Sequence, residues 1–104
     1  MNKYNIQFSK DARNDLLDIY SYIKYNLKEP NIAKKTIQKI KEEIYKLEYS
    51  PTMYLIIQDS VIKRQEIRKI KVKNYFVFYK VNEDNKNIEV VRIMYAKRNW
   101  EKLL

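Results

Sequence analysis

Apolar and polar residues alternate at the start of the chain and then change to a helical spacing. In Tyr4–Phe8 every second residue is apolar, which predicts a short strand with one buried face. Ser9 follows as a helix N-cap, and Asp11 suits the positive end of the helix dipole. The next apolar residues, spaced by four, three, four and four, are Ala12, Leu16, Ile19, Ile23 and Leu27. They predict an amphipathic helix that ends near Lys28, because Pro30 disfavours α-helical geometry at the residue before it.

A second helix is predicted from Pro30, whose missing N–H costs nothing in a first helical turn. Its apolar residues, spaced by four, three, four and three, are Ala33, Ile37, Ile40, Ile44 and Leu47. Ser50 and Pro51 end this helix. So short a connection between two long helices predicts that they run antiparallel, as a hairpin.

The second half of the chain has the period of strands. Residues 52–62 include an apolar stretch that fits either a strand or a loop. From Ile67 onward the period is two, with Lys69, Lys71 and Lys73 on the side of Ile67 and with Arg68, Ile70 and Val72 on the other side. Further strands are predicted at Tyr75–Val81, which is apolar on both sides, and at Ile88–Tyr95. Residues 82–85 form a turn by composition, and Asn74 is expected to take a positive φ in a tight turn.

The order of elements is therefore strand, helix, helix and then three strands. We predict an α+β fold in one domain, residues 1–104, with the helical hairpin 9–49 packed on one face of a four-stranded antiparallel sheet. A hairpin covers only one face, so the other face meets water or a partner. Lys69, Lys71 and Lys73 belong on that open face if Ile70 and Val72 face the helices.

Composition narrows the classes of chemistry. The chain of 104 residues contains no cysteine, histidine or glycine. Thiolate metal sites, histidine-dependent nucleophilic catalysis and glycine-rich phosphate loops are thereby excluded. No cofactor is expected. No apolar run is long enough to span a membrane, and no secretory signal is recognisable, which fits a cytoplasmic protein.

The net charge of +9 favours a nucleic acid or an acidic protein as partner, although a solvated lysine-rich surface is the plain alternative. Residues 63–73 hold six basic side chains and one acidic one. Arg92, Lys97 and Arg98 follow near the end. Interleaved among them are Tyr75, Tyr79, Tyr95 and Trp100. Rings that stack on bases beside cations that hold phosphates suit single-stranded nucleic acid, whereas cross-strand packing of the tyrosines is the alternative.

The sequence also predicts the surroundings of one arginine and of three aspartates. Arg92 shares its predicted strand face with Val90 and Met94, so it must either face the open side of the sheet or pair across strands. Three aspartates on the first helix, Asp11, Asp15 and Asp18, are expected to be exposed rather than to hold a metal.

Four segments in this order resemble the RelE/ParE toxin superfamily: FSKDARNDLLDIYSYI, EPNIAKKTIQKIKEEIYKLEYSP, IRKIKVKNYFVFYKV and IEVVRIMYAKRNW. The resemblance covers nearly the whole chain. It implies a sheet packed against an N-terminal helical hairpin, and a toxin that a co-encoded acidic antitoxin neutralises in a hetero-oligomer. Such a module arrests growth and can stabilise a plasmid.

The resemblance implies one of two activities. RelE-like members cleave mRNA on the ribosome, and ParE-like members poison DNA gyrase without a nuclease site. If the chain is a nuclease, its catalytic residues are Lys69, Lys71, Arg92, Tyr95 and Arg98. Residues expected to bind the target or the antitoxin are Arg64, Arg68, Lys73, Tyr75, Tyr79, Arg98 and Trp100.

The choice between the two activities rests on departures from the nuclease pattern. Phe76 stands where the best-known nucleases have an arginine, and Leu104 stands where they have a tyrosine. The ending also resembles a ParE-type tail, with Asn99 in place of its aspartate. We therefore favour inhibition of gyrase. The alternatives are a ribosome-dependent mRNA endonuclease and a non-toxic nucleic-acid-binding module, so whether the chain is an enzyme stays open.

Overall fold

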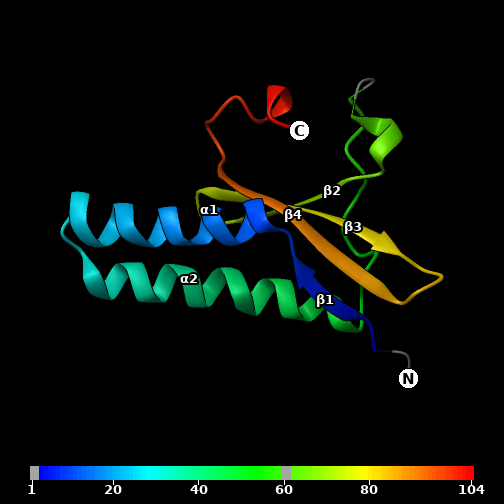
Figure 1. Cartoon of the computed structure of the whole chain (residues 1–104), viewed down its shortest axis with the longest axis horizontal. Helices are drawn as coiled ribbons and strands as arrows, with labels where there is room; N and C mark the ends of the chain where they lie inside the picture. The colour runs from blue at the N-terminus through cyan, green and yellow to red at the C-terminus, as the bar shows by residue number, and fades with distance from the viewer. Residues whose placement is uncertain (1–2, 60–61) are drawn as a thin grey trace.

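Two antiparallel helices lie along one side of a four-stranded sheet in the computed structural model, which describes residues 3–59 and 62–104 (Figure 1). The strands are β1 (Asn5–Phe8), β2 (Arg68–Val72), β3 (Tyr75–Asn82) and β4 (Asn87–Tyr95). The helices are α1 (Lys10–Ser21) and α2 (Pro30–Tyr45). Short helical turns occupy Tyr22–Asn26, Lys46–Glu48, Lys63–Gln65 and Trp100–Lys102. The α+β architecture and the helical hairpin are as predicted.

The helix ends follow from local chemistry. The Ser9 hydroxyl accepts a hydrogen bond from the backbone N–H of Ala12 at 3.0 Å, which caps α1. The same hydroxyl donates to the carbonyl of Val91 at 2.7 Å, so the cap also fixes α1 to β4. Beyond Ser21 the helix widens into the π-helical turn Tyr22–Asn26. Pro30 opens α2 as predicted.

The sheet is mixed rather than wholly antiparallel, which corrects one detail of the prediction. Its strand order is β1-β4-β3-β2, and β1 runs parallel to β4 with Asn5 opposite Asn87. The helical hairpin returns the chain to its starting point, since the N–H of Tyr4 donates to the carbonyl of Glu48 at 2.9 Å. The chain then crosses to the far edge and comes back through β2 and β3 to β4. Alternation in a sequence indicates which face a residue occupies but not the direction of its strand.

Both faces of the sheet are covered, although not equally. The larger core lies between the helices and the sheet, and includes Ala12, Ile40, Ile44, Ile70, Val72, Val77, Tyr79, Ile88, Val90 and Ile93. Ile70 and Val72 thus face the helices, which is the condition under which Lys69 and Lys71 were expected on the other face. A smaller core occupies the other face, with Ile57, Ile62, Ile67, Phe78 and Met94 buried and with Phe76, Trp100 and Leu104 packed against them. The face expected to be open is therefore partly closed by the loop before β2 and by the C-terminal tail.

The segment before β2 and the β2–β3 turn are irregular in structure. Tyr54 to Ile57 is loop, apart from one isolated bridge between Ile56 and Arg68. In the β2–β3 turn the positive φ, 54°, belongs to Lys73 rather than to Asn74, which corrects the prediction. Within residues 3–59 and 62–104, no helix is both long and apolar enough to span a membrane.

Candidate functional site

Arg92 is held by a helix and not by a neighbouring strand. Its Nε donates to Oδ2 of Asp15 at 2.8 Å, and its NH2 donates to Oδ1 at 2.9 Å. The backbone N–H of Ile93 donates to the same carboxylate at 2.9 Å. Asp15 is only 8% exposed, so the expectation of an exposed aspartate was wrong. The two-pronged hydrogen bond to Asp15, followed by the charge of its carboxylate, raises the pKa of Arg92, which stays charged.

A β-bulge explains why the pairing of Arg92 differs from the prediction. Phe78 lies opposite Arg92 while Tyr79 lies opposite Val90, so Val91 is an extra residue in β4. The bulge reverses the alternation: Val90 belongs to the larger core and Met94 to the smaller one. Val90 and Met94 therefore lie on opposite faces, contrary to the prediction. β1 pairs with β4 only as far as Val90. Beyond that residue, the carboxylate of Asp15 on α1 accepts a hydrogen bond from the backbone N–H of Ile93 in β4.

Lys69 is tied to the C-terminal tail. Its Nζ lies 4.4 Å from the ring centre of Phe76 and 4.7 Å from that of Trp100, within the range of cation–π attraction. Trp100 stands edge-on to Phe76 and is tilted against Phe78 at 5.2 Å between ring centres. Trp100 thus closes the smaller core, and Lys69 covers it.

Tyr95 lies on the face opposite to these lysines. It pairs with Tyr75, and the two rings meet edge-on with their centres 5.9 Å apart. Tyr75 packs against the larger core, on the helix side of the sheet. Lys69 and Lys71 pair with Phe78 and Phe76, which face the smaller core. The sheet therefore separates Tyr95 from both lysines.

Tyr79 is a core residue in the structure, contrary to its predicted role in binding. Its side chain is fully buried, and its hydroxyl donates to the carbonyl of Pro51 at 2.9 Å. Burial raises the pKa of Tyr79 to about 12, although the nearby Arg68 works against this rise. Arg68 itself is half-buried and donates to the carbonyl of Tyr54 at 2.6 Å.

The remaining predicted site residues lie on the surface. Exposed side chains belong to Arg64, Lys71, Lys73, Tyr95 and Arg98. The five predicted catalytic residues thus do not converge: Arg92 and Lys69 are engaged by the fold, and Tyr95 lies apart from the lysines. Asp15 was not singled out as a functional residue, and the only signal for it was its place in the same helical face as Ala12 and Ile19.

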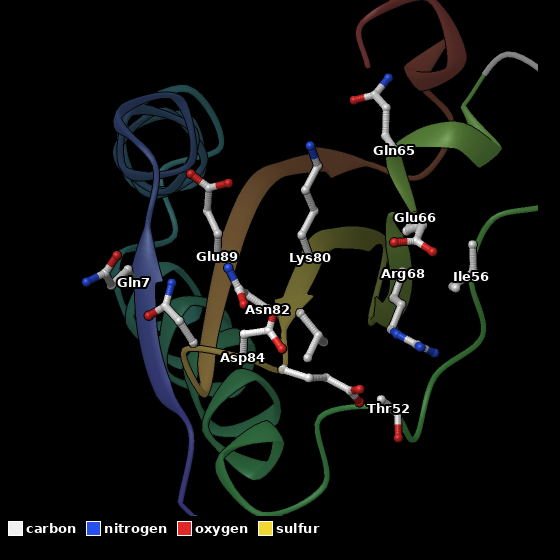
Figure 2. Close-up of a pocket in the computed structure, with 13 residues that line it drawn as sticks. Gln7, Thr52, Ile56, Gln65, Glu66, Arg68, Lys80, Asn82, Asp84 and Glu89 are labelled. Atoms are coloured by element: carbon white, nitrogen blue, oxygen red, sulfur yellow. The ribbon is translucent and has the colours of Figure 1, made fainter.

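One hollow of the surface lies elsewhere. It measures about 730 Å³ and is bordered by the sheet, by the loop around Thr52 and Ile56, and by Gln65 and Glu66 (Figure 2). Glu89 and Lys80, which pair across β4 and β3, contribute opposite charges to it. Of the predicted site residues, only Arg68 borders this hollow. Within the described part of the chain, no three carboxylates gather closely enough to hold a metal ion.

Comparisons with known proteins agree with this geometry. A family model described as the ParE toxin of the type II toxin–antitoxin system parDE matches residues 6–100. A chain of the chromosomal ParDE toxin–antitoxin system from P. aeruginosa superposes with a TM-score of 0.75 at 20% identity, over 93% of this chain and 100% of that chain. A chain of the RelBE2 toxin–antitoxin complex from Mycobacterium tuberculosis superposes with a TM-score of 0.66 at 16% identity, over 93% and 97%.

A chain of the intact E. coli RelBE toxin–antitoxin complex gives a TM-score of 0.63 at 16% identity, over 91% of this chain and 99% of that one. No curated protein sequence matches. These structures establish the fold, and the family model covers nearly the whole chain. The chain therefore belongs to the ParE family of toxins of type II toxin–antitoxin systems.

Proposed function

We propose that this toxin arrests growth by binding DNA gyrase, and that an acidic antitoxin encoded with it blocks this binding. The observation that carries the choice of target is the separation of Tyr95 from Lys69 and Lys71 by the sheet. In-line cleavage of RNA needs a proton acceptor, a proton donor and cations around one phosphate. Without histidine, Tyr95 was the best candidate for proton transfer, and it does not share a face with the lysines.

The contacts of Arg92 also favour gyrase over mRNA as the target. A guanidinium that stabilises a phosphorane must direct its N–H groups at the substrate. Two of the N–H groups of Arg92 are directed at Asp15 instead, and its side chain is only 20% exposed. Phe76, where the nucleases resembled by this chain have an arginine, packs against Trp100. These contacts suit a protein-binding toxin better than a nuclease.

An antitoxin partner is supported by the apolar surface of the hairpin and by the overall charge. Large apolar side chains about half or more exposed on or near the helices are Leu17, Tyr22, Tyr25, Leu27, Ile32 and Tyr45. Large exposed apolar patches are typical of interaction sites. The net charge of +9 favours an acidic partner. Two of the similar structures, from RelBE systems, were solved as toxin–antitoxin complexes.

Two assays on the purified toxin test the target. One follows supercoiling by gyrase, and the other follows mRNA cleavage on programmed ribosomes. We expect inhibited supercoiling that persists in Tyr95→Phe, because protein binding tolerates the loss of one hydroxyl. Tyr49→Phe is the matched control, since Tyr49 is also exposed. Site-specific mRNA cleavage that is lost in Tyr95→Phe, with supercoiling untouched, would replace gyrase by ribosome-bound mRNA as the target.

A growth assay tests the toxin assignment itself. Expression of the chain alone should arrest growth, and co-expression with the adjacent gene should restore it. Normal growth with soluble toxin present would favour a non-toxic nucleic-acid-binding module.

A further inference from the structure

The sheet has one edge that the rest of the described chain leaves open. β1 is the outermost strand and, within residues 3–59 and 62–104, it pairs only with β4. The backbone N–H groups of Asn5 and Ser9 donate to carbonyls on the β4 side, at 2.9 Å each. Because successive residues of a strand point their backbone groups to opposite sides, those of Ile6 and Phe8 face outward. β1 therefore presents donors and acceptors that no described strand pairs.

The opposite edge of the sheet is protected. The N–H of Ile57 donates to the carbonyl of Ile67 at 2.8 Å, so the preceding loop covers the start of β2. β2 also carries three cations, Arg68, Lys69 and Lys71, and charged side chains along an edge discourage the addition of a further strand. β1, with the sequence NIQF, has no charged residue. β1 is thus the edge at which extension of the sheet meets no such barrier.

The hollow shown in Figure 2 begins at this open edge. Gln7 of β1 borders it, and so does Glu89, which lies opposite Gln7 in β4. Lys80 of β3, opposite Glu89, continues the same row. In a strand added to β1, every second side chain would extend this row on the face that holds the hollow. The side chains between them would lie beside Ile6 and Phe8, which pack against the larger core.

The hollow is acidic although the chain is strongly basic. Four carboxylates border it, and all four are exposed: Glu66, Glu83, Asp84 and Glu89. The two cations on its border are Arg68 and Lys80, so its formal net charge is −2 in a chain of +9. Arg68 is in addition engaged by the carbonyl of Tyr54. The hollow therefore attracts cations, whereas the chain as a whole repels them.

We propose that an extended segment of a partner protein, in which lysine or arginine alternates with apolar residues, adds to the edge of β1. Its backbone pairs with Ile6 and Phe8, and its cations enter the hollow beside Glu89. Such strand addition takes affinity from main-chain hydrogen bonds and specificity from alternate side chains. An acidic segment or a nucleic acid would meet the carboxylates of the hollow, and a helix would leave the edge unpaired. The site does not depend on gyrase as the target.

Fluorescence anisotropy on the purified toxin tests the charge of the segment with two labelled peptides of about seven residues each, long enough to pair along a strand. Lysine alternates with valine in one peptide, and glutamate alternates with valine in the other. Attraction by the net charge of +9 alone would favour the glutamate peptide. We expect the lysine peptide to bind more tightly by about fivefold or more, because the local acidic surface decides the preference. Equal or tighter binding of the glutamate peptide would overturn the proposal.

Substitutions at the hollow locate the bound peptide. Glu89→Gln should weaken binding of the lysine peptide by about threefold, the effect of one exposed ion pair. Glu101→Gln, at an exposed glutamate that does not border the hollow, is the matched control and should leave binding unchanged. Circular dichroism establishes that both variants are folded. Equal effects of the two substitutions would place the peptide elsewhere and refute the site.

Hydrogen exchange measured by NMR tests the strand pairing itself. Saturating lysine peptide should slow exchange of the N–H groups of Ile6 and Phe8 by about fivefold or more, because each gains a hydrogen bond at the edge. The N–H of Asn5, which is already paired in the free toxin, is the internal control and should change less. Peptide binding without protection of Ile6 and Phe8 would rule out strand addition at β1.

Discussion

Asp15 on α1 and Arg92 on β4 are joined by two hydrogen bonds of 2.8 and 2.9 Å, although 77 positions separate them in the chain. The same carboxylate also accepts the N–H of Ile93. One side chain thus fixes α1 to the edge of β4 beyond the last residue that pairs with β1. The relationship explains why Arg92 is needed by the fold.

Asp15→Ala should destabilise the toxin by about 2–4 kcal/mol. The substitution leaves a partly buried guanidinium without its partner and the N–H of Ile93 without its acceptor. Urea unfolding followed by circular dichroism measures the loss. Asp15→Asn should cost less, because its amide oxygen still accepts one hydrogen bond. Asp18→Asn, at an exposed aspartate of the same helix, is the control and should change stability by less than about 0.5 kcal/mol. Equal losses at Asp15 and Asp18 would contradict the role given to the ion pair.

Tyr79 should make the folded toxin sensitive to alkali. Its pKa is about 12 in the folded chain, against an ordinary value of 10. Above pH 10 the unfolded tyrosine loses its proton while the folded one keeps it, so the unfolded state gains stability. The stabilisation is therefore complete below pH 10 and is lost as the pH rises towards 12.

Tyr79→Phe tests this dependence directly. At neutral pH the variant should lose about 1 kcal/mol, because the hydrogen bond to Pro51 is removed. Between pH 10 and 12 its stability should fall less steeply than that of the parent chain. Tyr49→Phe, at an exposed tyrosine, should follow the parent curve. Parallel curves for Tyr79→Phe and the parent would show that Tyr79 titrates alike in both states.

Trp100→Ala should destabilise the toxin by about 1–3 kcal/mol, because it opens the smaller core above Phe76 and Phe78. Arg98→Ala, two residues earlier and exposed, should leave stability within about 0.5 kcal/mol of the parent. Chemical unfolding measures both. Comparing the two substitutions distinguishes two roles within the C-terminal segment: Trp100 supports the fold, and Arg98 is free for a target. A stable Trp100→Ala variant would mean that the tail does not close this face.

The sequence predicted the elements well because each carries a period that burial imposes. The helical spacing from Ala12 and from Ala33 identified the hairpin, and the alternation around Ile70 identified the face that meets it. The direction of β1 was not predictable, since alternation is the same in parallel and antiparallel strands. The bulge at Val91 was also hidden, because an extra residue shifts the faces without changing the apolar content of a strand.

The candidate site was predicted less well, because cations and rings look alike in a sequence whether they are buried or exposed. The apolar character of Tyr75–Val81 on both faces did signal a second buried side, but not that Trp100 and Leu104 would cover it. Nothing in the spacing indicated that Tyr79 would be buried while Tyr95 stays exposed. These outcomes depend on contacts between segments far apart in the chain.

Lys71→Glu should slow association with the antitoxin at low salt. Lys71 is exposed, and it lies on a face where Lys69 is half-buried against aromatic rings. Reversing the charge of Lys71 therefore changes the surface potential with little effect on packing, whereas Lys69→Glu would also place a carboxylate over those rings. Long-range attraction between an acidic antitoxin and this face acts mainly on the association rate.

Stopped-flow measurements over a range of salt concentrations distinguish attraction from contact. The rate difference should be several-fold at low salt and should shrink as salt rises, because exposed charges are screened beyond about 10 Å at 0.1 M. Glu101→Lys is the opposite control, since it adds charge at an exposed position in the C-terminal turn and should speed association. Rates that stay the same in both variants at low salt would place the approach of the antitoxin on another face. A difference that persists at high salt would instead place Lys71 inside the interface, where its partner is shielded from the solvent ions.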